Sequence, residues 1–141
     1  MGALHHSTLT TLKLIHRGKV RDIYEVDDDH LLIVATDRLS AFDVVLPQPI
    51  PGKGAVLTRV ANFWFERTRG IVPNHLSDLA VPDVVGDAAE RAALTDRAVV
   101  VKRLSPLPVE AIVRRQVVAQ QARPPAAGTL GRPGHRGPCH Q

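Results

Sequence analysis

Five short apolar runs, separated by turn-forming residues, set the pattern of the chain between residues 12 and 114. Runs of this length and composition predict strands rather than helices. An acidic triplet, Asp27 to Asp29, lies between two of the runs and favours a turn, because short aspartate side chains bond nearby backbone groups. The first three strands should therefore form a meander. The predicted strands span residues 12–16, 22–26, 31–36, 98–103 and 109–113.

Two helices are expected between the third and the fourth strand. The segment 58–69 has the spacing of an amphipathic helix and is followed by a glycine, a typical helix stop. Its apolar residues Val60, Phe63 and Trp64 need a sheet to cover them. A shorter helix is expected over 87–94. Together these elements predict an α+β fold with a mainly antiparallel, strand-rich sheet and one principal helix.

The composition changes abruptly after Arg114. Residues 115–141 hold four prolines, four glycines and four arginines, but no acidic and no aromatic residue. Such a segment buries too little apolar surface to offset the entropy lost on ordering. We therefore expect a folded domain over 1–114 and a largely disordered tail over 115–141. The alternative for residues 116–122 is an extension of a strand or a turn of helix. The single cysteine, Cys139, lies in this tail and has no partner for an internal disulfide.

The excess positive charge of the chain also lies in the tail. Residues 1–114 carry 14 Lys and Arg against 14 Asp and Glu, so they have no net charge. A nucleic-acid-binding domain would concentrate basic residues in its folded part, and no nucleic-acid partner is expected. No apolar run approaches the ~20 residues of a membrane span, and the N-terminus lacks the pattern of a signal peptide. No membrane association and a cytoplasmic location are therefore expected.

The motif GKVR at residues 18–21 lies between two predicted strands. Gly18 allows the backbone to approach a ligand closely, and Lys19 and Arg21 supply cationic donors that suit phosphate oxygens. The same pattern is also typical of a solvent-exposed hairpin, so the motif alone does not decide between the two.

A second motif, DRLSAFD at residues 37–43, follows a strand that is apolar on both faces. Its carboxylates, guanidinium and hydroxyl form the kind of polar cluster that binds a small ligand at a sheet edge. The alternative is a capped loop in which Asp37 or Ser40 bonds backbone amides and Arg38 pairs with an acid. The sequence leaves both interpretations open.

Lys102 lies in an apolar strand and either reaches solvent or directs its ammonium at an anion above the sheet. Kinase-type folds place such a strand lysine under a glycine-rich hairpin. Glu110 and Arg114 are four residues apart, so in a strand they share one face and either pair or bind substrate together. The stretch 52–54 is not a P-loop, because an earlier glycine and a following Ser or Thr are missing.

Taken in order, six blocks of the sequence resemble the SAICAR synthetase family. Their order over 98 residues, from Arg17 to Arg114, makes the resemblance specific. It implies a kinase-like, ATP-grasp-like lid domain of a ligase that joins carboxyaminoimidazole ribonucleotide to L-aspartate, using ATP and Mg²⁺ and releasing ADP and phosphate. The blocks are GKVRDIYEV, DRLSAFD, PIPGKG, NFWFERT, VPNHL and VVVKRLSPLPVEAIVR.

The resemblance also implies roles for individual residues. The ATP contacts it implies are Gly18, Lys19, Val20 and Arg21 over the phosphates, Lys102 beside them and Leu104 near the adenine. The substrate contacts it implies are Ser40, Asp43 and Arg114, the last with the ribonucleotide phosphate. Lys19, Arg21 and Lys102 should then approach one concave face, and the ATP assignment depends on this convergence.

After Arg114 the chain departs from the family pattern, which continues into a second portion with the acidic Mg²⁺ ligands. No metal ligand and no catalytic residue is therefore assigned in this chain. One interpretation is that the parent protein is the ligase and this chain an inactive fragment of it. The alternative is a non-catalytic nucleotide-binding or interaction module.

Overall fold

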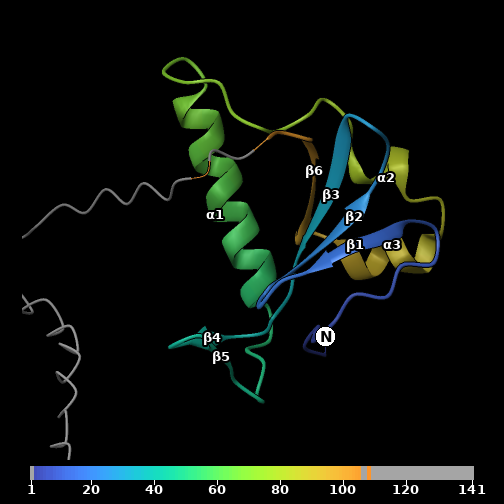
Figure 1. Ribbon diagram of the computed structural model, residues 1–141, viewed down its shortest axis with the longest axis vertical. Coiled ribbons are helices and arrows are strands. Elements are labelled where there is room, and N and C mark those ends of the chain that lie inside the picture. The colour runs from blue at the N-terminus through green and yellow to red at the C-terminus, as the bar shows by residue number, and fades with distance from the viewer. Residues whose placement is uncertain (1, 106–107, 109–141) are drawn as a thin grey trace, which may run out of the picture. The chain divides into compact units, whose positions relative to one another are not determined.

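The computed structural model of the protein describes residues 2–105 and residue 108, and its centre is an antiparallel sheet of four strands in the order β1-β2-β3-β6. The first three strands form the expected meander, and β6 returns beside β3 after the helices (Figure 1). The strands are β1 (Lys13–Arg17), β2 (Arg21–Glu25), β3 (His30–Ala35) and β6 (Ala98–Lys102). Each lies within one residue of its predicted position. The strand predicted over 109–113 lies outside the described residues.

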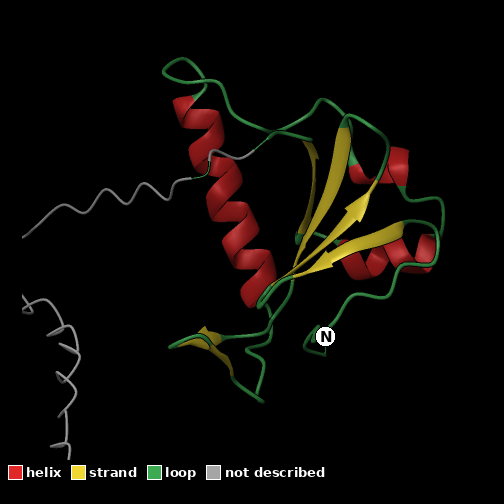
Figure 2. Cartoon of the chain, viewed as in Figure 1, coloured by secondary structure: helices red, strands yellow, loops and turns green. Residues whose placement is uncertain are grey.

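Three helices and a small hairpin complete the described part (Figure 2). The principal helix and the helix near residue 90 were expected, and Asp87 caps the latter by accepting a hydrogen bond from the Glu90 amide at 2.8 Å. The sequence did not predict α2 or the β4–β5 hairpin, because elements of two to four residues are too short to show a periodicity. Their bounds are α1 (Lys53–Thr68), α2 (Val81–Val84), α3 (Ala88–Leu94), β4 (Ser40–Ala41) and β5 (Val44–Val45).

The core lies on the face of the sheet that α2 and α3 cover. Tyr24 pairs with Leu32 and Leu32 with Val100 across neighbouring strands, so all three side chains lie on this face. Val85, which follows α2, and Leu94 at the end of α3 complete the buried cluster. The α+β fold with a mainly antiparallel sheet is therefore confirmed.

The other face of the sheet carries α1, which begins five residues earlier than expected, at Lys53. Gly54, in its first turn, is buried against the end of β3. The expectation that Val60, Phe63 and Trp64 pack on the sheet is wrong, because these side chains are 50%, 55% and 58% exposed. The side of α1 toward the sheet combines small and polar residues with Leu57 and Phe65. Val60, Phe63 and Trp64 fall on the opposite side.

Asp37 ties three separate parts of the chain together at the end of β3. Its fully buried carboxylate accepts hydrogen bonds from the amides of Leu4 and Gly54, at 2.8 and 2.9 Å, and from the Arg97 guanidinium at 3.0 Å. Burial opposes ionisation, but these donors outweigh it and hold the pKa of the Asp37 carboxyl below its ordinary value. For Asp37, the capped-loop interpretation of the second motif is therefore correct.

Within residues 2–105, no helix has both the length and the apolar character that crossing a membrane requires. The described elements all belong to one unit, Met1–Pro106. The predicted boundary at Arg114 and the predicted disorder of the tail lie outside the described residues.

Candidate functional site

A cavity of about 240 Å³ lies between the sheet and α1. This volume is below the ~300–1,000 Å³ of a typical ligand pocket, so the cavity has room for only part of a nucleotide-sized molecule. Its walls are largely apolar and come from both sides. The apolar walls include Ile33, Ala35 and Val99 from the strands and Leu57, Ala61 and Phe65 from α1.

Two cationic side chains line this apolar cavity, Arg21 from β2 and Lys53 from the start of α1. Neither forms an ion pair with any residue between 2 and 105. Unpaired cations beside an apolar wall are an arrangement that suits an anionic ligand with an apolar part. Sequence reasoning missed Lys53, although its spacing of four and eight residues from Leu57 and Ala61 places it on the same face of a helix.

His75 closes another side of the cavity. Burial, assisted by the nearby charge of Arg21, lowers the pKa of the His75 imidazole. The ring lies 5.0 Å from the ring of Phe65, centroid to centroid. At neutral pH, His75 is therefore an uncharged part of the wall.

The hairpin between β1 and β2, residues 18–21, is here called the Gly18 hairpin. Its carbonyl groups point to partners inside the protein. The Arg38 guanidinium donates to the carbonyls of Gly18 and Lys19, both at 2.9 Å. The Val20 carbonyl accepts from the amide and the hydroxyl of Thr36, at 3.1 and 2.8 Å. The start of the second motif therefore fixes the backbone of the first.

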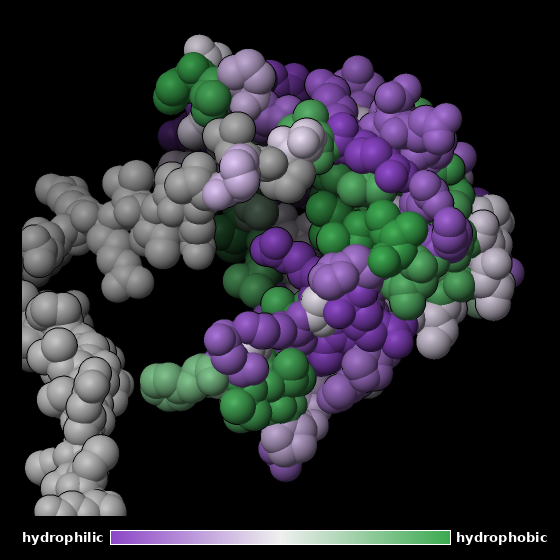
Figure 3. All heavy atoms as spheres, in the orientation of Figure 1, coloured by the Kyte–Doolittle hydropathy of each residue, from purple (hydrophilic) through white to green (hydrophobic). Residues whose placement is uncertain are grey.

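The side chain of Lys19 meets Asp43 of the β4–β5 hairpin, with 2.6 Å between Nζ and Oδ1. The hydrogen bond from the Lys19 ammonium lowers the pKa of the Asp43 carboxyl. Both side chains are exposed, and exposed ion pairs contribute little stability. An anionic ligand can therefore replace Asp43 as the partner of the Lys19 ammonium. Ser40 lies in the same hairpin and pairs with Val45. Apolar side chains also reach the surface over this hairpin (Figure 3).

Lys102 does not join this group, and the predicted convergence of Lys19, Arg21 and Lys102 is wrong. Arg21 pairs with Ala35 at one end of β3, whereas Lys102 pairs with His30 at the other. Five residues of strand separate the two positions, roughly 16 Å at 3.3 Å per residue. The strand register also puts Lys102 on the core face, opposite Arg21. The ATP assignment that depended on this convergence therefore fails in its predicted form. The groups left to form a nucleotide site are the Gly18 hairpin, Lys53 and the cavity.

Two of the remaining predicted residues lie beyond this region. Leu104 follows β6 and its side chain is 64% exposed. Arg114 lies outside the described residues. Among the residues that the structure describes, no three His, Cys, Asp or Glu side chains are grouped so that they could hold a metal ion.

Comparisons with known proteins identify a matching family model, similar sequences and a similar solved structure. The model of the SAICAR synthetase family matches residues 14–132, beyond the boundary that composition predicted. Phosphoribosylaminoimidazole-succinocarboxamide synthase from Thioalkalivibrio sulfidiphilus is 62% identical over 115 residues, and that from Methylobacillus flagellatus is 63% identical over 111. These matches cover 82% and 79% of this chain but only 39% and 37% of the relatives, so the chain spans about two fifths of their length.

A solved structure shows the same relationship. The structure of SAICAR synthase from Saccharomyces cerevisiae complexed with SAICAR matches with a TM-score of 0.67 and 41% identity. The match covers 72% of this chain and 37% of the yeast chain. The fold shared at 41% identity and the family match over residues 14–132 indicate the same family. The chain belongs to the SAICAR synthetase family.

Proposed function

We propose that this chain supplies the ATP-binding part of a purine-biosynthesis ligase. The ligase joins carboxyaminoimidazole ribonucleotide to L-aspartate and forms the succinocarboxamide, ADP and phosphate. Family membership supports the reaction class. One observation carries the nucleotide assignment: Val20 and Arg21 of the Gly18 hairpin and Lys53 of α1 line one apolar cavity, and neither cation has an ion-pair partner within residues 2–105. Because ATP and the ribonucleotide are cytoplasmic metabolites, we place the protein in the cytoplasm.

The described residues fit the needs of a nucleoside triphosphate. The apolar walls suit a base or a ribose, and Arg21 and Lys53 supply positive charge beside them. Lys19, in the same hairpin as Arg21, adds a cation that is paired with Asp43. Bound ATP supplies the phosphoryl group that activates the substrate carboxylate. Cationic donors held in place lower the barrier of such a transfer, because they neutralise charge on the moving phosphoryl oxygens. Gly18 and Val20 contribute the backbone of the hairpin.

The described residues do not fit Mg²⁺, because they hold no group of acidic or imidazole side chains placed to bind a metal. In the proposed ligase, the metal ligands belong to the portion of the family that this chain does not span.

The substrate side is proposed to include Ser40, Asp43 and Arg114, with Arg114 facing the ribonucleotide phosphate. Support for Asp43 comes from its contact with Lys19 at 2.6 Å, which puts it at the edge of the proposed phosphate site. Leu104 is kept as a proposed adenine contact. The family resemblance is the support for this contact, because Leu104 follows Lys102 at the end of β6 and does not line the cavity.

For the isolated chain we propose nucleotide binding without ligase activity, because it spans about two fifths of its relatives' length. The 141-residue chain should release no ADP with ATP, L-aspartate and carboxyaminoimidazole ribonucleotide. Joining residues 1–114 to the remaining portion of the Thioalkalivibrio sulfidiphilus relative should restore turnover. ADP release by the unmodified chain that requires both other substrates would contradict this proposal.

The restored ligase also tests the proposed phosphate site. Lys19→Ala should lower kcat/KM about 100-fold, a typical loss when one donor to a charged transition state is removed. The matched control is Lys13→Ala, an exposed lysine on β1 that pairs with Glu25 away from the cavity. Equal effects of the two substitutions would show that the Gly18 hairpin does not serve the reaction.

A further inference from the structure

Arg38 is the largest fully buried side chain of the described part, with 2% of its surface exposed. A buried guanidinium needs a charged partner, and the Asp22 carboxylate supplies one at 2.8 Å. Burial opposes ionisation of Asp22, but the Ser7 amide and Arg38 outweigh it and hold the pKa of the carboxyl below its ordinary value. One ion pair neutralises the arginine. The other N–H donors of Arg38 can therefore bind uncharged acceptors such as backbone carbonyls.

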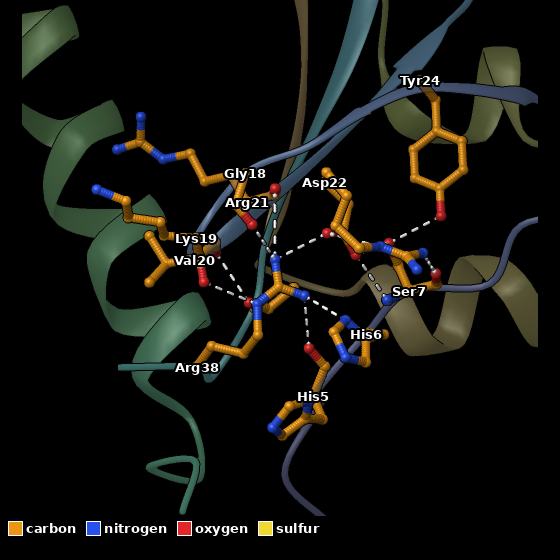
Figure 4. Close-up of polar contacts among 12 residues, drawn as sticks. His5, His6, Ser7, Gly18, Lys19, Val20, Arg21, Asp22, Tyr24 and Arg38 are labelled. Carbon is orange, nitrogen blue, oxygen red and sulfur yellow. Dashed lines mark hydrogen bonds and ion pairs between the residues drawn. The ribbon is translucent and has the colours of Figure 1, made fainter. Parts of the chain in front are cut away.

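Those donors bind the backbone of the Gly18 hairpin (Figure 4). Arg38 Nε donates to the Lys19 carbonyl and Nη2 to the Gly18 carbonyl, with a longer contact of 3.4 Å to the Arg21 carbonyl. A single side chain thus holds three carbonyl groups of a four-residue hairpin. Arg38 holds the Lys19 carbonyl, whereas the Lys19 ammonium makes only an exposed contact with Asp43.

The orientation of these carbonyls decides where the neighbouring amides point. All described peptide bonds are trans, so each N–H points opposite to the carbonyl of the preceding residue. Because the Gly18 and Lys19 carbonyls face Arg38, the N–H groups of Lys19 and Val20 face away from it. Within residues 2–105, these two N–H groups donate to no acceptor. Successive free N–H groups in a turn form an anion-binding concavity.

We propose that Arg38 is a positioning residue of the phosphate site, which turns the amides of Lys19 and Val20 toward the nucleotide phosphates without touching the nucleotide. This inference rests on the proposed function of the Gly18 hairpin. Hydrogen bonds from a cation to the carbonyls also polarise the peptide groups, which makes their N–H groups stronger donors. A neutral or shorter side chain at position 38 cannot both orient these amides and polarise their peptide groups.

The N-terminal segment completes the support of Arg38. Nη1 donates to the His5 carbonyl at 2.8 Å and to Nδ1 of His6 at 2.6 Å. Partial desolvation of the ring beside Arg38, followed by the charge of Arg38, lowers the pKa of the His6 imidazole, which keeps Nδ1 available as an acceptor. His6 is exposed, so its substitution loosens the support of Arg38 without removing the buried charge.

The affinity ratio for ATP over adenosine, measured by calorimetry on the full 141-residue chain, tests this role. Arg38→Lys should weaken ATP binding about tenfold, the equivalent of ~1.4 kcal/mol, and leave adenosine binding within about twofold. His6→Ala should lower the ratio by a smaller factor, about two- to threefold. A merely structural role would change stability and leave the ratio of a folded variant unaltered.

Arg97→Lys is the matched control, because Arg97 is also buried and paired with a buried carboxylate but does not contact the hairpin. It should lower thermal stability and preserve the ratio. A ratio unchanged in both Arg38→Lys and His6→Ala would overturn the positioning role. A wild-type chain that binds ATP no better than adenosine would instead refute the proposed function, and the role of Arg38 with it.

A measurement on the wild-type chain covers the case in which Arg38→Lys does not fold. ATP should shift the NMR signal of the Arg38 Nε–H group, which donates to the Lys19 carbonyl but lies outside the cavity lining. Adenosine should leave this signal in place. Shifts of the Lys19 and Val20 amides without any shift of the Arg38 signal would contradict the proposal.

Discussion

Replacing Asp37 by asparagine should lower the free energy of unfolding by about 3–5 kcal/mol, the usual effect of breaking a buried ion pair. The substitution leaves the buried Arg97 guanidinium without its carboxylate and turns an amide NH₂ toward a backbone donor. Since domains of this size are stable by only ~5–15 kcal/mol, the change should be severe. Urea unfolding followed by circular dichroism measures it.

Asp96→Asn is the control, because Asp96 pairs with Arg59 in an exposed ion pair and should contribute less than ~1 kcal/mol. The pKa of Asp37 is lowered below 3.8 in the folded chain, so the stability from its ionisation is present above pH 3.8. That stability is lost as the pH falls further, and wild type and Asp37→Asn should then converge. A difference between them that stays constant down to low pH would show that the carboxylate is not the stabilising group.

Gly54→Ala should be comparably destabilising, by about 3 kcal/mol, because it forces two backbone segments apart. A Cβ atom at Gly54 would lie 2.2 Å from the carbonyl oxygen of Ala35 and 3.1 Å from that of Thr36. The neighbours are backbone atoms of β3 and its extension, which cannot rotate away as a side chain can. Thermal unfolding of the variant measures the effect.

Gly70→Ala is the matched control, since no atom outside its chain neighbours lies within 4 Å of the added Cβ. It should change stability by less than ~1 kcal/mol. Equal stability of Gly54→Ala and the wild type would mean that α1 does not approach β3 as closely as described.

The sequence predicted the four-stranded sheet well, because its signals are local. Apolar runs bounded by turn residues predicted the bounds of β1, β2, β3 and β6 to within one residue. The run from Asp27 to Asp29 marks the turn between β2 and β3. The start of α1 was missed for a physical reason. In the sequence alone, a glycine such as Gly54 predicts the end of a helix and not its first turn. In the structure, the missing side chain of Gly54 allows the first turn of α1 to contact the end of β3.

The buried face of α1 could not be predicted from hydrophobicity. Large apolar residues such as Trp64 normally turn inward, yet Trp64 is exposed, and Phe65 lies toward the sheet beside Gly54, Thr58 and Asn62. Trp64 is 58% exposed in the described part of the chain, and no local sequence signal predicts this. An amphipathic pattern gives the two faces of a helix, but not which of them meets the sheet.

Within the candidate site, the sequence identified both motifs but did not predict the contact between them. Lys19 was assigned to the phosphates and Asp43 to the substrate side, and the structure shows that their side chains meet. Lys102 was placed beside the phosphates because kinase-type folds use a strand lysine, but its register with His30 puts it at the far end of the sheet. The role of Arg38 depends on contacts with residues 16 to 33 positions away, which no local pattern reveals.

The most direct test of the central claim is an ATP titration of the full, isotope-labelled chain followed by NMR. The claim is that the Gly18 hairpin and the cavity beside α1 bind the nucleotide. We expect saturable shifts of the Lys19, Val20 and Lys53 amides, with a dissociation constant on the order of millimolar, because a nucleotide held by one part of a longer protein loses ~4 kcal/mol of contacts. Saturable shifts confined to other residues, with these three amides unmoved, would contradict the claim.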